Sequence, residues 1–122
     1  MILIGDKIVP FKEFNKISSK NDIEKSRANS IVSFGYNETL LIYCFENNIS
    51  FAVIISNIKE AIYANSLNAK YLICNKTLAT DVQKIADNYM FDSKVLAIIE
   101  SNDEIEDIAL NQIDGIIYKS LI

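Results

Sequence analysis

Runs of apolar residues without polar alternation dominate the second half of the chain. They cover residues 51–55, 71–74, 95–99 and 115–118, and a fifth, less pure run covers residues 30–34. A strand with water on one face alternates apolar and polar residues, so continuous apolar runs predict strands that are covered on both faces. Strands of this kind are typical of a parallel sheet against which helices pack.

The segments between these runs have the apolar spacing of helices. Asn37, Asn57, Asn75 and Ser101 precede them, and Asn and Ser side chains accept hydrogen bonds from the free N–H groups of a first helical turn. Asn57 and Ser101 also stand three residues before a Glu, which is the spacing of a capping box. The residues expected to face inward are Leu40, Leu41, Tyr43, Cys44 and Phe45 in the first helix and Ile58, Ala61, Ile62 and Leu67 in the second.

Strands that alternate with helices predict an α/β fold, and two architectures fit five strands. The first is a single open parallel sheet of three α/β/α layers, with the flavodoxin-like strand order 2-1-3-4-5. The second is a (βα) half-barrel, which carries all its helices on one side of the sheet. We favour the open sheet, because a half-barrel monomer would expose strand faces that are apolar here.

Residues 1–122 are expected to form a single α/β domain, since this length can bury one core without disulfides or metal. Residues 30–122 form its β-α core. Within residues 1–29, the segments 1–4 and 7–9 predict a β-hairpin around Gly5 and Asp6, and Pro10 would end it. A short helix is expected to begin near Ser19 or Asn21.

Composition excludes several classes of function. The net charge of −4, with one arginine and scattered lysines, argues against nucleic-acid binding. The chain has no histidine, so it cannot build a Ser-His-Asp or Cys-His catalytic site, and it lacks the commonest metal ligand. The three glycines form no phosphate-binding loop, so we expect neither a cofactor nor a metal. The apolar runs are shorter than the ~20 residues of a membrane span, and two cysteines in apolar surroundings suggest reduced thiols in a cytoplasmic protein.

Ligands of parallel α/β proteins bind beyond the carboxyl ends of the strands. The polar residues expected at this edge include Glu100 and Lys119, which would supply the charges of a site. Helix capping explains most of the others equally well. The candidate ligand-binding residues are Tyr36, Asn37, Asn57, Asn75, Lys76, Glu100, Ser101 and Lys119.

Two functions follow as hypotheses. The favoured one is a non-enzymatic cytoplasmic interaction or regulatory module that self-associates or binds a protein partner. Its basis is the lack of catalytic combinations and the free edges of the expected hairpin, with Phe11, Phe14 and Tyr36 as contact residues. The alternative is a small-molecule or phosphoester-binding domain, which could be an enzyme, at the carboxyl edge of the sheet.

Overall fold

A computed structural model describes residues 1–26 and 29–122 of the chain. Seven parallel strands form one sheet in the order β1-β7-β6-β5-β4-β3-β2. The strands are β1 (Ile2–Ile4), β2 (Phe14–Lys16), β3 (Ile31–Gly35), β4 (Phe51–Ile54), β5 (Tyr71–Cys74), β6 (Lys94–Ile99) and β7 (Gly115–Tyr118). The helices are α1 (Lys20–Glu24), α2 (Glu38–Glu46), α3 (Ile58–Ser66), α4 (Lys76–Asn88) and α5 (Ile105–Leu110), with short 3-10 turns η1 (Asn102–Glu104) and η2 (Lys119–Leu121).

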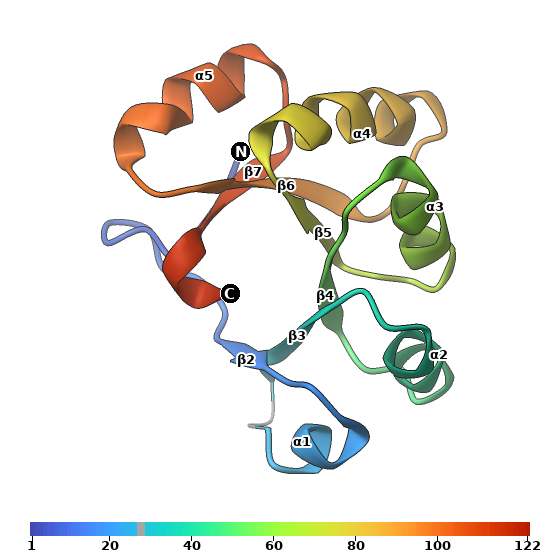
Figure 1. Cartoon of the computed structure of the whole chain (residues 1–122). Helices are drawn as coiled ribbons and strands as arrows, with labels where there is room; N and C mark the ends of the chain where they lie inside the picture. Colours follow the sequence, from blue (N-terminus) through green and yellow to red (C-terminus); the bar gives the residue numbers. More distant parts are fainter. Residues whose placement is uncertain (27–28) are drawn as a thin grey trace.

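The sheet is curled, and the five helices lie on its outer, convex side (Figure 1). The α/β class and the parallel sheet are therefore confirmed, and the architecture is the half-barrel. The flavodoxin-like order is not confirmed, because the five core strands β3 to β7 lie side by side in sequence order. Right-handed crossovers that always step in the same direction place every helix on one face, whereas a three-layer sheet needs a reversal of direction.

The expectation that a half-barrel exposes its apolar inner face was wrong. The curl brings strands that are distant in the sheet close together, so that Phe14 of β2 stacks on Tyr71 of β5 with ring centroids 5.9 Å apart. Leu121 and Ile122 pack against the same inner face from the end of the chain. The inner face is buried at Ile4, Ile31, Ala52, Ile73, Leu96 and Ile117.

The predicted N-terminal hairpin is not formed. Strand β1 pairs in parallel with β7, and β2 pairs in parallel with β3, so the two strands lie at opposite edges of the sheet. Residues 7–9 are irregular and exposed. The segment 5–13, which we call the strap, runs between the two edges across the open side of the curl (Figure 1).

Two helices bury different residues from those expected. Helix α2 buries Leu40, Leu41 and Cys44, but Phe45 remains 43% exposed. Helix α3 buries the small residues Ala61 and Ala64, whereas its larger apolar side chains are exposed, including the predicted inward residues Ile58 and Ile62. Within the described part of the chain, no helix is long and apolar enough to cross a membrane.

Candidate functional site

The carboxyl edge of the sheet carries an open hollow where β1, β7 and β6 end. Its volume is about 510 Å³, within the range of small-molecule sites. We call it the carboxyl-edge hollow. It is lined by residues 5–8 of the strap, by residues 100–102 after β6, and by Tyr118 and Ser120.

Two polar contacts hold the rim of the carboxyl-edge hollow. The Lys119 Nζ lies 3.3 Å from the Glu100 Oε1, and the Tyr118 hydroxyl donates a hydrogen bond to the Asp6 Oδ2 at 3.0 Å. Desolvation raises the pKa of Tyr118, and the hydrogen bond to Asp6 raises this pKa further. The structure thus brings the predicted residues Glu100, Ser101 and Lys119 together. The Glu100 and Lys119 side chains are about seven-tenths exposed, so their ion pair is weak.

The three asparagines expected at this edge act as helix caps. The Oδ1 atoms of Asn37, Asn57 and Asn75 accept backbone hydrogen bonds at the starts of α2, α3 and α4, at 3.1, 2.9 and 2.9 Å. They are spread along the edge and do not line the carboxyl-edge hollow. Tyr36 lies farther along the edge, beside α2 and α3.

Lys76 is also occupied, in an ion pair with a carboxylate of this chain. Its Nζ lies 2.7 Å from the Glu104 Oε1. The hydrogen bond from Lys76, together with backbone hydrogen bonds from Glu100 and Ser101, lowers the pKa of Glu104 to about 2. Lys76 therefore positions a carboxylate of this chain, and it is not presented to a ligand.

Acidic side chains of the protein itself fill three helix starts. The Glu104 Oε2 accepts the N–H groups of Glu100 and Ser101 at 2.7 and 3.1 Å. In the same way, Glu60 accepts the N–H of Ser56 at 2.8 Å, and Asp22 accepts those of Ser18 and Ser19 at 2.9 and 3.1 Å. Phosphate binding at helix N-termini needs free N–H groups and a positive field. Carboxylates at these starts remove both, so these three positions suit phosphoesters poorly.

Both cysteines are free and buried, in agreement with the sequence prediction. Burial raises the pKa of Cys44 to about 11 and that of Cys74 to about 12. A thiol with so high a pKa carries almost no thiolate near neutral pH, so neither cysteine is suited to act as a nucleophile. No group of Cys, Asp or Glu side chains in residues 1–26 and 29–122 could hold a metal ion.

One surface of exposed apolar side chains was not predicted from the sequence. We call it the α2–α3 face: large apolar side chains that stand exposed on these two neighbouring helices, with a hollow of about 310 Å³ between them. The signal was the unbroken apolar run at residues 40–45, which gives α2 no polar side. The exposed fractions are 49% for Ile42, 43% for Phe45, 37% for Ile58, 46% for Ile62 and 54% for Tyr63.

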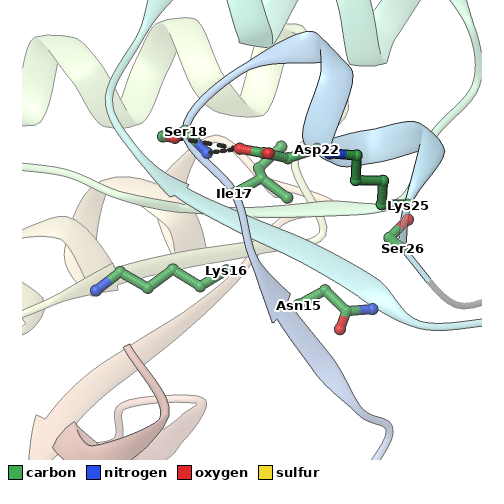
Figure 2. Close-up of a pocket in the computed structure, with 7 residues that line it drawn as sticks. All are labelled: Asn15, Lys16, Ile17, Ser18, Asp22, Lys25 and Ser26. Carbon is green, nitrogen blue, oxygen red and sulfur yellow. Dashed lines mark hydrogen bonds between the residues drawn. The ribbon is translucent and has the colours of Figure 1, made fainter.

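A further hollow of about 440 Å³ lies between β2 and α1, at the opposite edge of the sheet from β1 (Figure 2). It is lined by residues 15–18 and by Asp22, Lys25 and Ser26. Another polar hollow, of about 470 Å³, lies between α1 and α2 and includes Asn37 in its lining. Comparison of the chain with known protein families and with curated protein sequences gives no match.

Proposed function

We propose that this protein is a non-enzymatic cytoplasmic interaction module that self-associates through the α2–α3 face. The observation that carries the proposal is the exposure of five large apolar side chains on two adjacent helices. Twelve large apolar residues of the described chain are exposed, and no other pair of helices carries so many of them. Of these five, Ile42 and Tyr63 line the hollow between the two helices, and an exposed apolar patch of this kind is characteristic of a protein-interaction surface.

The composition of α2 supports this role. A helix on the surface of a monomer normally shows an apolar stripe toward the core and polar residues outside. Helix α2 has apolar residues at all six positions from 40 to 45, and only three of them are buried. Burying Ile42 and Phe45 against a second copy would cover this outer side. A patch that is used by both partners is what a two-fold dimer requires.

The polar residues of the carboxyl edge support a non-enzymatic role. Most of them cap helices or pair with one another, as Asn37, Asn57, Asn75 and Lys76 do. Capping is a structural task that any helix needs. A catalytic role would instead require a base or nucleophile with a pKa tuned toward neutral pH, whereas both thiols are shifted away from it.

The test is the oligomeric state of two charge variants. Ile42→Glu and Tyr63→Glu place a carboxylate on the α2–α3 face at positions about half exposed, so the fold should persist. We expect wild-type protein to show a concentration-dependent dimer in sedimentation experiments and both variants to remain monomeric, because an interface core tolerates charges poorly.

Leu110→Glu is the matched control, because Leu110 is 82% exposed on α5, away from this face. It should dimerise as wild type does. A wild-type protein that stays monomeric at high concentration would overturn the proposal, and so would a Leu110→Glu variant that dissociates as readily as Ile42→Glu.

One observation favours a second candidate, the binding of a small polar molecule. Glu100 lines the carboxyl-edge hollow and forms an ion pair with Lys119. Thermal unfolding with phosphates, nucleotides, carboxylic acids and polyols tests it, because a ligand at 100 times its dissociation constant adds ~2.7 kcal/mol of stability. We expect neutral polyols to stabilise more than phosphates, and Glu100→Gln to reduce the effect. If no class stabilises the protein, this candidate is excluded.

A further inference from the structure

Strand β2 is the edge strand at one side of the sheet, and some of its backbone groups point away from the sheet. The N–H of Ile31 donates to the Glu13 carbonyl, and the N–H of Ile17 donates to the Ser33 carbonyl, both at 2.9 Å. Successive residues of a strand direct their backbone groups to opposite sides. Because Glu13, Asn15 and Ile17 face β3, the N–H and C=O groups of Phe14 and Lys16 face away from the sheet.

The hollow between β2 and α1 lies beside this free edge (Figure 2). Lys16 leaves β2 in the direction away from α1, whereas Lys25 stands on the α1 side. Neither lysine forms an ion pair with any residue in 1–26 or 29–122. Two cations therefore flank the free edge, one on each face of the sheet.

The one carboxylate of this hollow is already engaged. Asp22 accepts the N–H groups of Ser18 and Ser19 and the Ser18 hydroxyl at 2.9, 3.1 and 3.1 Å. These hydrogen bonds lower the pKa of Asp22 and hold its charge at the start of α1. Among the residues that line this hollow, the charges left for a partner are those of Lys16 and Lys25, in a protein whose overall charge is −4.

We propose that the free edge of β2 binds an extended acidic segment of a partner protein as an added strand. The backbone of the segment would pair with Phe14 and Lys16, as in other cases of strand addition. Its consecutive side chains point to opposite faces, so two adjacent acidic residues would meet Lys16 and Lys25 separately. A second copy fits poorly, because pairing β2 with itself brings the same lysines together.

This surface is separate from the α2–α3 face, so the inference does not depend on self-association. Lysine on an edge strand can also serve only to prevent unwanted strand pairing. The two roles make opposite predictions for an acidic peptide, because a guarded edge rejects every added strand and a binding edge accepts a complementary one.

The probe is a capped hexapeptide with the central sequence Val-Glu-Glu-Val, titrated into the full-length protein and followed by the amide NMR signals of residues 13–17. We expect saturable binding that weakens as salt rises. Lys16→Ala and Lys25→Ala should each reduce affinity ~3-fold, as for an exposed ion pair. Lys84→Ala, an exposed lysine on α4, should bind as wild type does.

Two comparisons separate strand addition from charge attraction alone. Lys16→Pro removes an outward N–H that β3 does not use, so it should bind more weakly than Lys16→Ala. A peptide N-methylated at both Glu residues should bind more weakly than the unmodified one, which keeps the test decisive if Lys16→Pro does not fold. Equal binding of a Val-Lys-Lys-Val peptide, wild-type affinity of both alanine variants, or equal binding of the N-methylated peptide would overturn the proposal.

Discussion

Among the carboxyl groups of the described residues, that of Glu104 has the most strongly lowered pKa. Glu104 closes the capping box of η1 and pairs with Lys76, so one carboxylate ties the start of α4 to the loop after β6. The sequence predicted the capping box, because the spacing of Ser101 and Glu104 is local. It did not predict the pairing with Lys76, which is 28 residues earlier in the chain and is brought near only by the fold.

Replacement of Glu104 by Gln should lower stability in a pH-dependent way. The folded-state pKa of about 2 lies below the ordinary value of 4.5. A depressed carboxyl pKa contributes stability that is complete above pH 4.5 and is lost as the pH falls toward 2. We expect Glu104→Gln to lose about 1 kcal/mol at pH 7, the usual magnitude for a helix cap, and to match wild type near pH 2.

Urea unfolding of both proteins at pH 7, 4 and 2.5 measures this difference. Glu106→Gln is the control, since Glu106 is exposed in the next turn and has no ion pair in the described part of the chain. It should change stability little at any pH. A Glu104→Gln deficit that stays constant from pH 7 to 2.5 would contradict the assignment.

Among the elements, the five core strands, the four helices between them and the strand near residues 1–4 were predictable from sequence, but β2 and the partner of β1 were not. Core strands form continuous apolar runs, and their helices begin at capping residues, so each is defined by its own few residues. The hairpin was inferred from a local turn signal at Gly5 and Asp6. The real partner of β1 is β7, more than 110 residues away, and a pairing at that distance leaves no local pattern.

Gly115 is the residue that allows β1 to join the sheet. A Cβ atom at this position would press against the Ile2 carbonyl oxygen and lie 2.6 Å from the Ile2 Cβ. Gly115→Ala should therefore push β1 away and lower the free energy of unfolding by about 1–3 kcal/mol, the usual cost of overpacking. Urea unfolding measures the loss, and faster hydrogen exchange at residues 2–4 should locate it.

Gly35→Ala is the matched control for this change. A Cβ atom at Gly35 meets no atom within 4 Å, so the substitution should leave stability unchanged or raise it slightly by restricting the unfolded chain. Equal losses in the two variants, or unchanged exchange at residues 2–4 in Gly115→Ala, would show that close packing of β1 on β7 is not the cause.

For the molecule as a whole, the exposed surface was the hardest property to predict. The sequence identified Glu100, Ser101 and Lys119 as residues of one edge, and they do meet there. It placed Phe45 and Ile62 inside, because an apolar residue on a helix is normally buried. Both are exposed because α2 and α3 pack on the curled sheet through other residues of each helix. Among the described residues, no second layer of helices covers the outer side of α2 and α3.

The sequence by itself determined the alternation of strands and helices, the parallel sheet and the helix caps, because each depends on residues only a few positions apart. Only the tertiary structure decided the direction in which successive strands add, the one-sided layer of helices and the two free edges. These follow from pairings between distant segments and from the curl that buries the inner face. The surfaces proposed for partners, the α2–α3 face and the edge of β2, belong to this second group.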